Sequence, residues 1–389
     1  MSASPLRVLM VSSLWPPSVI GGAELYASRL AAALRARGHV VGAFTLGVDG
    51  EDVVGVVRPW PYRLDTYAEQ PAWKRALFHA RDVYDPATAR ALRRTVARWR
   101  PDVVHSHSVR GLSVAALTAP RPAARVHHLH DYSLLCQRDS LTRRDGRSCE
   151  TRCGPCRVLS GVRTSLLAQH RPDLVLSVSQ AVTDEHRPIG WLAPLVRLHP
   201  LPADHVPTAF TRDRSAGPVT FGYLGQLTAV KGVRTLLAAF DLLARGSARL
   251  VIAGRGALAD DIAAHARGRD DVDVRGWVAG EEREQFFADL DALVVPSEWK
   301  EPGGTVNLEA RSRGLITVVS DIGGVPEYVD VASRPLLFAP GDVAALAASL
   351  ARVVEEPDRY RPTTPPGPAW HEHIDRTVEL YREAIEPAR

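Results

Sequence analysis

Short apolar runs alternate with amphipathic stretches along most of this chain, and this pattern restricts its possible folds. Runs rich in Val, Leu or Ile are predicted to be strands, at 7–12, 40–46, 102–107, 125–130, 173–179, 220–225, 249–254, 272–278, 291–297 and 316–321. Helical patterns lie between several of them, such as the one over 23–38, which closes at Gly38. Near-continuous apolar strands with helical crossovers are typical of parallel sheets covered on both faces. The sequence therefore predicts an α/β protein with doubly wound sheets.

The alternation breaks once, at 200–218, where prolines and charged residues replace the periodic pattern. We place an interdomain linker there, because 389 residues are enough for two domains that each bury a core. An N-terminal Rossmann-like domain is predicted over 1–205, with a Cys-rich insertion at 131–160. A second such domain is predicted over 206–369. The amphipathic stretch within 370–389 follows a Pro-rich break and could pack back on the N-terminal domain.

Composition says little about partners. A net charge of +4 over 389 residues is mild, and it fits a small anionic ligand or a membrane surface as well as nucleic acid. No apolar run approaches the roughly 20 residues of a membrane-spanning helix, and the N-terminal run is more typical of a buried strand than of a signal peptide. We expect a cytoplasmic protein without a nucleic-acid partner, and peripheral contact with the inner membrane face stays open. The oligomeric state is not predicted.

Two glutamates flank a glycine turn in the segment SEWKEPGGTVNLEARSRG. Glu301 precedes the turn formed by Gly303, Gly304 and Thr305, and Glu309 lies one turn into the helix predicted to follow. Backbone N–H groups at a helix start favour an anion, and glycine lets it come close. A carboxylate can accept hydrogen bonds from two vicinal hydroxyls. The segment therefore predicts a ligand with polyhydroxyl groups at both ends and an anionic centre, such as a nucleoside diphosphate sugar. The alternative is a helix start that is acidic only because its dipole favours carboxylates.

Two further glycine turns follow predicted strands. In GYLGQLTAVKG, Lys231 stands at a helix start, where its ammonium could neutralise a leaving diphosphate. The alternative is an exposed loop lysine, although the chain has only three lysines. Gly21 and Gly22 precede the first predicted helix and form a similar turn. The absence of GxGxxG there disfavours a nicotinamide dinucleotide domain.

Taken together, the chain resembles the family-4 retaining glycosyltransferases of the GT-B fold. The resemblance rests on GGAE near the start, HLHDYSLLC, GYLGQLTAVKG, PSEWKEPGGTVNLEARSRG and SDIGGVPEYV. It implies two Rossmann-like domains facing across a cleft. It also implies transfer of a hexose, with retention, from a nucleoside diphosphate sugar (UDP, GDP or ADP) to a hydroxyl of a glycan, lipid or secondary metabolite. The implied mechanism is a front-face substitution that requires no metal or other cofactor.

The resemblance also assigns roles to residues. The predicted catalytic residues contact the donor sugar, the diphosphate or the acceptor: Glu301, Lys231 and His130. The predicted donor-binding residues are Gly21, Gly22, Gln226, Lys231, Arg255, Val278, Glu301, Gly303, Gly304, Thr305 and Glu309, of which Glu309 would hold the ribose. Gln226 stands where the family often has Arg, so Arg255 or Arg234 would have to supply that charge. Gly303–Gly304 replaces a frequent Phe-Gly, which puts the donor sugar in doubt.

All four cysteines lie in one arginine-rich segment: Cys136, Cys149, Cys153 and Cys156. In a cytosolic chain, such clustering indicates metal before disulfides, and four thiolates fit a closed structural zinc site. One or two disulfides, or thiols without a metal, are the alternatives. The arginines of this segment could bind an anion on the acceptor side. The alternative is that they only form the solvated face of a loop.

Four histidines occur as period-2 pairs at the ends of predicted strands: His105, His107, His128 and His130. A histidine metal site is one interpretation. The favoured one is ordinary hydrogen bonding, which is common for histidines at the rim of a sheet.

Three rival functions remain open from the sequence. A sugar hydrolase or phosphorylase would use two carboxylates across one bond, but it would leave the glycine turns and Lys231 unexplained. A nucleotide-sugar epimerase is a second rival on the same fold. The rival outside enzymes is an Arg-rich zinc module that binds polyanions with a steep salt dependence.

Overall fold

The structure is a computed structural model that describes residues 4–18, 21–47, 49–60, 70–143, 148–203 and 217–386. The chain divides into two compact units. The first comprises Met1–Ser140, Thr151–Pro200 and His371–Arg389, and the second comprises Leu141–Glu150 and Leu201–Trp370. The C-terminal segment thus groups with the first unit. Residues 141–150, inside the Cys-rich segment, group with the second.

The first unit contains a parallel sheet of seven strands in the order β3-β2-β1-β4-β5-β6-β7. Its strands are β1 (Arg7–Val11), β2 (Val40–Leu46), β3 (Val53–Val57), β4 (Val103–Ser106), β5 (Ala124–Leu129), β6 (Leu174–Ser177) and β7 (Val196–Leu198). The central strand β1 is buried from its second residue onward. The two edge strands, β3 and β7, were not predicted. β7 has three residues and is mostly exposed. β3 is apolar, with Gly55 at its centre, but four of its five residues are only partly buried.

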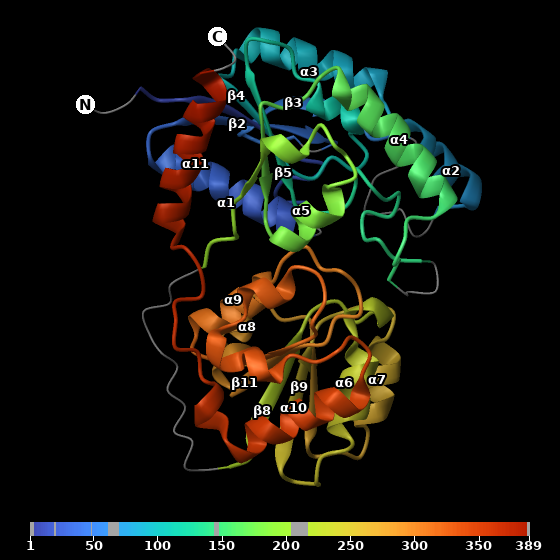
Figure 1. Cartoon of the computed structure of the whole chain (residues 1–389), viewed down its shortest axis with the longest axis vertical. Coiled ribbons are helices and arrows are strands. Elements are labelled where there is room, and N and C mark those ends of the chain that lie inside the picture. Colours follow the sequence, from blue (N-terminus) through green and yellow to red (C-terminus); the bar gives the residue numbers. More distant parts are fainter. Residues whose placement is uncertain are drawn as a thin grey trace. The chain divides into compact units, whose positions relative to one another are not determined.

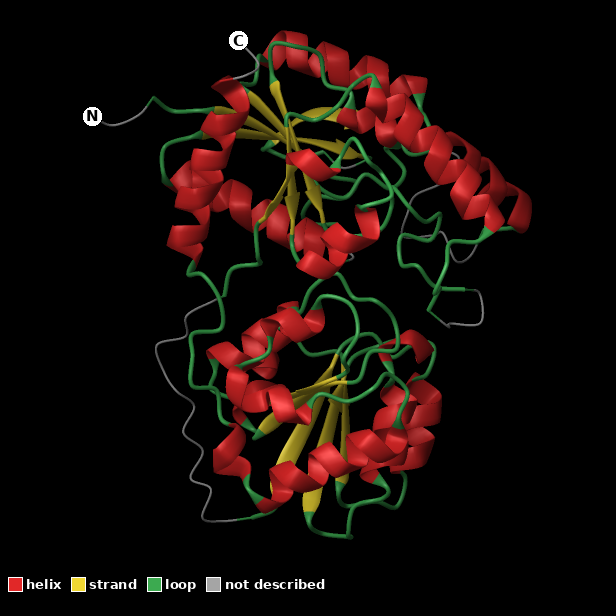
Figure 2. Cartoon of the chain, in the orientation of Figure 1, coloured by secondary structure: helices red, strands yellow, loops and turns green. Residues whose placement is uncertain are grey.

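Helices cover both faces of this sheet (Figures 1 and 2). They are α1 (Gly22–Ala36), α2 (Ala72–Arg81), α3 (Pro86–Trp99), α4 (Gly154–Ala168), α5 (Gln180–His186) and α11 (Trp370–Ile385). Local capping sets some of their starts: the Asp85 carboxylate accepts from the backbone N–H groups of Ala87 and Thr88, and proline occupies the first position of α3. Tyr381 of α11 is completely buried, and this helix groups with the first unit.

The second unit contains a five-stranded parallel sheet in the order β10-β9-β8-β11-β12. The strands are β8 (Val219–Leu224), β9 (Ala248–Ala253), β10 (Val272–Gly276), β11 (Ala292–Val295) and β12 (Ile316–Val319). Its helices are α6 (Val233–Phe240), α7 (Ala259–Ala266), α8 (Glu281–Ala288), α9 (Thr305–Ser312) and α10 (Val343–Glu355). Leu250 belongs to one buried apolar cluster and its neighbour Val251 to another. Burial on both faces explains why these strands are continuously apolar in sequence.

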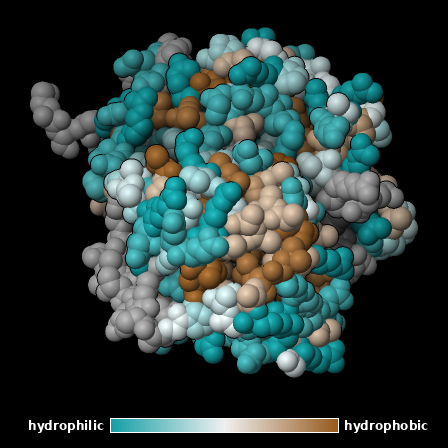
Figure 3. Space-filling view, turned by 60° about the horizontal axis from the view of Figure 1, so that its bottom comes forward, coloured by the Kyte–Doolittle hydropathy of each residue, from teal (hydrophilic) through white to brown (hydrophobic). Residues whose placement is uncertain are grey.

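No helix in the described ranges is long and apolar enough to cross a membrane. On the face drawn in Figure 3, hydrophilic residues predominate and separate several hydrophobic areas.

Candidate functional site

Two strand-to-helix connections form the candidate donor site of the second unit. Strand β8 leads into the 3-10 turn Ala229–Lys231 and then into α6, while the neighbouring strand β11 leads through residues 296–304 into α9. The connections are joined directly, because the N–H of Glu298 donates to the carbonyl oxygen of Val230 at 2.9 Å. Parallel strands put their carboxyl ends at one edge, which is where open α/β sheets bind ligands.

Lys231 and Glu301, predicted to serve one ligand, lie in contact. The ammonium nitrogen of Lys231 is 2.9 Å from Oε1 of Glu301, and the two side chains are 24% and 13% exposed. The hydroxyl of Ser297 also donates to Glu301 Oε1. The ammonium lies 5.2 Å from the centre of the Trp299 ring. The pair is therefore partly shielded from water yet still open to a ligand, and a bound diphosphate would compete with Glu301 for the lysine.

The backbone of Glu301 contacts residues 323–327, the GGVPE segment further along the chain. The N–H of Gly324 donates to the Glu301 carbonyl oxygen at 2.7 Å. Gly323 has a φ of +64°, and a Cβ there would lie 2.5 Å from the same oxygen. This close approach explains on physical grounds why glycine stands at this position.

Glu309 lies on α9 and forms an ion pair with Arg283 of α8. Its side chain is 20% exposed. Arg283 was not predicted as a site residue, because α8 has an acidic sequence without an apolar period that would orient it. Gly304 caps α9, and Thr305 is the first residue of that helix.

The two arginines considered as phosphate ligands, Arg255 and Arg234, already have partners in this structure. The guanidinium of Arg255 lies 4.6 Å from the centre of the Trp277 ring, and Arg234 pairs with Asp261 at 2.6 Å. The backbone carbonyl oxygen of Gln226 accepts a hydrogen bond from the Tyr223 hydroxyl at 2.7 Å. The side chain of Val278 is buried in an apolar cluster, so only its backbone could contact a nucleotide base.

In the first unit, the predicted glycine turn begins α1, with Gly21 as its N-cap. The N–H of Gly21 donates to Oε2 of Glu24 at 3.0 Å. Burial raises the pKa of the Glu24 carboxyl. A diphosphate bound at this turn would replace a contact that the protein itself now makes.

The first unit also carries a buried group that we call the histidine cluster: His105, His107 and His128. Their candidate ligand nitrogens all lie within 4.8 Å of one another. His105 lies in β4, His107 directly follows that strand, and His128 lies in the adjacent strand β5. Burial, followed by the charges of neighbouring histidines, lowers the pKa of each ring.

His130, the predicted acceptor-side residue, adjoins this cluster. Its Nε2 lies 3.1 Å from Nδ1 of His107. Two more histidines pack nearby: His373 of α11 contacts the Tyr26 hydroxyl at 2.7 Å, and His199 contacts the Thr377 hydroxyl at 2.9 Å. The rings of His199 and His373 are stacked with their centres 3.9 Å apart. No sequence pattern pointed to His199 and His373, because they come from distant parts of the chain.

The four cysteines do not form a metal-binding group in this structure. None is in a disulfide. Among the described residues, the one group of three or more side chains with metal-compatible spacing is the histidine cluster, so no three cysteine sulfurs lie within 4.8 Å of one another. Cys136 is buried, whereas Cys153 is exposed at the N-cap of α4. The four-cysteine zinc site stays a prediction that this geometry does not support.

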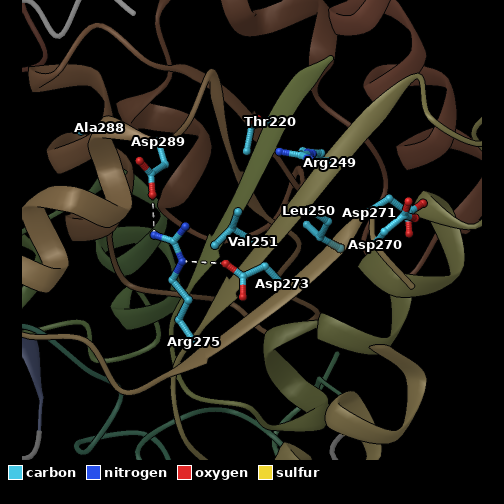
Figure 4. A pocket seen from close by; sticks show the side chains of 10 residues that line it. All are labelled: Thr220, Arg249, Leu250, Val251, Asp270, Asp271, Asp273, Arg275, Ala288 and Asp289. Carbon is cyan, nitrogen blue, oxygen red and sulfur yellow. Dashed lines mark hydrogen bonds and ion pairs between the residues drawn. The ribbon is translucent and has the colours of Figure 1, made fainter. Parts of the chain in front are cut away.

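Figure 4 shows a pocket of the second unit, and none of the residues that line it belongs to the candidate donor site. Residues near the amino ends of β8, β9 and β10 line it, including Thr220, Arg249 and Asp273. Arg275 pairs with Asp273 at 2.8 Å and with Asp289 at 2.6 Å. The pocket lies toward the amino ends of the strands, whereas the candidate donor site lies at their carboxyl ends. Because Arg275 is also already paired with two aspartates, we assign the pocket no ligand.

Solved structures show the class of fold. Sucrose-phosphate synthase from Thermosynechococcus elongatus matches with a TM-score of 0.71 and 21% identity, over 98% of this chain and 100% of that one. Anabaena HepE in complex with UDP matches with a TM-score of 0.66 and 19% identity, over 98% and 97%. Together with the two parallel-sheet units, these matches confirm the predicted GT-B glycosyltransferase fold.

Sequence comparisons show the family. The model of Glycosyltransferase Family 4 matches residues 20–202, and that of Glycosyl transferases group 1 matches residues 210–365. Glycogen synthase of Mycobacterium tuberculosis is 29% identical over 376 residues, covering 90% of this chain and 87% of that protein. The 2-deoxystreptamine N-acetyl-D-glucosaminyltransferase of Streptomyces fradiae is 27% identical over 417 residues, covering 95% and 93%. The chain belongs to the family-4 glycosyltransferases.

Proposed function

We propose that this glycosyltransferase moves a hexose from a nucleoside diphosphate sugar to an acceptor hydroxyl with retention of anomeric configuration. The observation that carries the proposal is the Lys231–Glu301 pair beside the glycine turn that begins α9. It puts a cation, a hydroxyl-binding carboxylate and a helix N-terminus at one edge of the sheet. UDP is the nucleotide we propose, on the example of HepE, which binds it.

In the proposed reaction, the bond between C1 of the sugar and the diphosphate oxygen breaks, and the acceptor oxygen bonds to C1 on the same face. The acceptor proton passes to the leaving diphosphate oxygen. Lys231 stabilises the charge that grows on the diphosphate, and Glu301 holds sugar hydroxyls. The predicted roles of Gly21, Gly22 and His130 belong to this proposal, and no divalent ion on the diphosphate is part of it.

A glycoside hydrolase is disfavoured by the surroundings of the two glutamates. Such an enzyme needs one carboxyl of its pair as a general acid. Here Glu301 forms an ion pair with Lys231, and Glu309 forms one with Arg283. We therefore assign both glutamates to accepting hydrogen bonds from hydroxyl groups of the ligand.

The test begins with a thermal-shift panel of UDP, GDP, ADP and dTDP and their sugars, since a ligand that binds only the folded state raises the unfolding temperature. The stabilising donor is then incubated with glycan, glucoside and aminocyclitol acceptors, with and without Mg²⁺. We expect product whose anomeric configuration, read by NMR, matches that of the donor, at equal rates in both conditions. A product of inverted configuration, or release of free sugar with no acceptor product, would contradict the proposal.

The ribose contact of Glu309 gives a separate prediction. Glu309→Gln should weaken UDP binding by about 10- to 100-fold, because a hydrogen bond to a charged group contributes about 1.5–3 kcal/mol. Binding of 2′-deoxy-UDP should fall much less, since it lacks one of the two hydroxyls. Isothermal titration calorimetry with both ligands measures the difference.

Glu284→Gln is the matched control for this substitution, because Glu284 joins the same two helices through Arg313 at 2.6 Å. It should leave the preference for ribose unchanged. If both variants lose UDP affinity equally, Glu309 acts through the packing of α8 and α9 and does not hold the ribose.

A further inference from the structure

We propose that the histidine cluster binds one Zn²⁺ ion through Nε2 of His105, Nε2 of His107 and a ring nitrogen of His128. The site lies within the first unit, it is distinct from the cysteines, and it does not depend on the proposed transferase function.

Strand geometry brings the three rings together. Residues two apart on a strand point to the same face, so His105 and His107 project from the same side of β4 and its end. The parallel register pairs His105 with Val126, which puts His128 of β5 beside His107. The rings of His105 and His107 have their centres 4.0 Å apart. Two histidines from one strand and a third from its neighbour thus point into one space.

Four ring nitrogens of the histidine cluster have no hydrogen-bond partner in the part of the chain that the structure describes. Within the described residues, Nε2 of His105, Nε2 of His107 and both nitrogens of His128 are buried without a hydrogen-bond partner. The three residues are 0%, 2% and 0% exposed. A buried polar atom without a hydrogen-bond partner destabilises the folded state. Four such atoms in one place are costly unless a further species binds to them.

The second ring nitrogens of His105 and His107 have partners of the kind that orient metal-binding histidines. Nδ1 of His105 lies 2.6 Å from the Tyr381 hydroxyl, and Nδ1 of His107 lies 3.1 Å from Nε2 of His130. If each Nδ1 carries the proton and donates it, each Nε2 presents its lone pair to the cluster. Metal-bound histidines commonly donate their second N–H in this way, which fixes the ring and the tautomer.

The chemistry of the donors favours zinc. Imidazole binds a metal through the lone pair of a ring nitrogen, and histidine is the commonest metal ligand in proteins. Three neutral imidazoles with a fourth position for water form a known type of zinc site, with Zn–N distances of about 2.0–2.1 Å. Small rotations of the rings would bring the three nitrogens, now within 4.8 Å of one another, close enough together to bind a single ion at that distance. Through His107, the ion would also orient His130.

Zinc content and X-ray absorption test the proposal without an activity assay. Untagged protein is depleted with a chelator during refolding, reloaded with zinc and desalted, and the zinc is counted by mass spectrometry. The same is done for the double variant Cys153→Ser/Cys156→Ser, which removes two of the thiolates that could bind zinc elsewhere. We expect about one zinc per chain to remain in the double variant. Its absorption edge should show nitrogen or oxygen neighbours at about 2.0–2.1 Å and no sulfur at about 2.3 Å.

Two histidine variants localise the ion. His128→Asn should lose this zinc. The matched control is His127→Asn, since His127 is the next residue of the same strand, is equally buried and contacts Ser106 on the other face. It should keep the zinc. If His128→Asn fails to fold, the absorption spectrum of the cysteine variant still decides.

Three results would overturn the proposal: no zinc in the cysteine variant, a shell that contains sulfur, or zinc retained in folded His128→Asn. The first would mean that water molecules satisfy the cluster. The second would place the ion at the cysteines.

Discussion

Replacing Lys231 by methionine should lower kcat/KM for sugar transfer by about 10³-fold. The substitution keeps the apolar stem and removes the charge. Two unit charges about 4 Å apart attract by about 4 kcal/mol at an effective dielectric constant near 20, and each 1.4 kcal/mol is a factor of ten in rate. The side chain is only 24% exposed, so solvent screens it incompletely. Most of the loss should fall on kcat, because the diphosphate gains charge in the transition state.

The Lys231 prediction is checked by steady-state kinetics together with calorimetry of UDP binding. UDP carries the diphosphate but no sugar, so its affinity should fall in Lys231→Met whatever happens to Glu301. Lys74→Met is the control, because Lys74 lies on α2 in the first unit, against Trp73. If Lys231→Met binds UDP as tightly as the unaltered protein does, the lysine only positions Glu301 and our assignment is wrong.

The double variant Lys231→Met/Glu301→Gln separates the two partners further. Residues in direct contact show coupling energies that single substitutions conceal. If Lys231 contacts the diphosphate and Glu301 the sugar, each single variant loses a different ligand contact. UDP affinity should then depend on Lys231, and discrimination between donor sugars should depend on Glu301.

The fold could be predicted from the sequence because its main signal is local. Every predicted strand overlaps an observed one, since central strands such as β1 and β11 are buried on both faces and read as continuous apolar runs. Strand β7 could not be found in this way, because it has three residues and is mostly exposed. Strand β3 is apolar but interrupted by Gly55, and it was missed although its sequence carries the same local signal. The predicted turn before α9 and the helix start near Lys231 also depend on local glycine patterns.

Contacts between distant segments were beyond the reach of sequence patterns. The contact of Tyr26 with His373 spans 347 positions along the chain, and no periodicity links them. Arg283 meets Glu309 only because α8 and α9 pack together. The histidine pairs at 105–107 and 128–130 were visible, but the unpartnered nitrogens depend on how β4 and β5 pair and on the position of Tyr381. The roles of the candidate site residues stay predictions until a ligand is bound.

Gly232→Ala should destabilise the second unit by about 2–5 kcal/mol. Gly232 joins Lys231 to α6 with a φ of +68°, and a Cβ there would lie 1.7 Å from the carbonyl oxygen of Pro296. The left-handed conformation costs a residue with a Cβ about 1–2 kcal/mol, and overpacking adds about 1–3 kcal/mol. The clash is with backbone, so no side-chain rotation relieves it. The two connections that carry Lys231 and Glu301 would have to separate, and UDP affinity should fall as well.

Gly246→Ala isolates the cost of the clash in Gly232→Ala. Gly246 lies in the same unit with a φ of +79°, and a Cβ there would meet nothing within 4 Å. The left-handed conformation destabilises both variants, but only the new Cβ of Gly232→Ala clashes with the Pro296 oxygen. Denaturant unfolding followed by tryptophan fluorescence should therefore show a small shift of the midpoint for Gly246→Ala and a much larger one for Gly232→Ala. Equal shifts would mean that the connection after β11 moves aside freely, and a connection that loose could not hold Glu301 against Lys231 for the reaction proposed above.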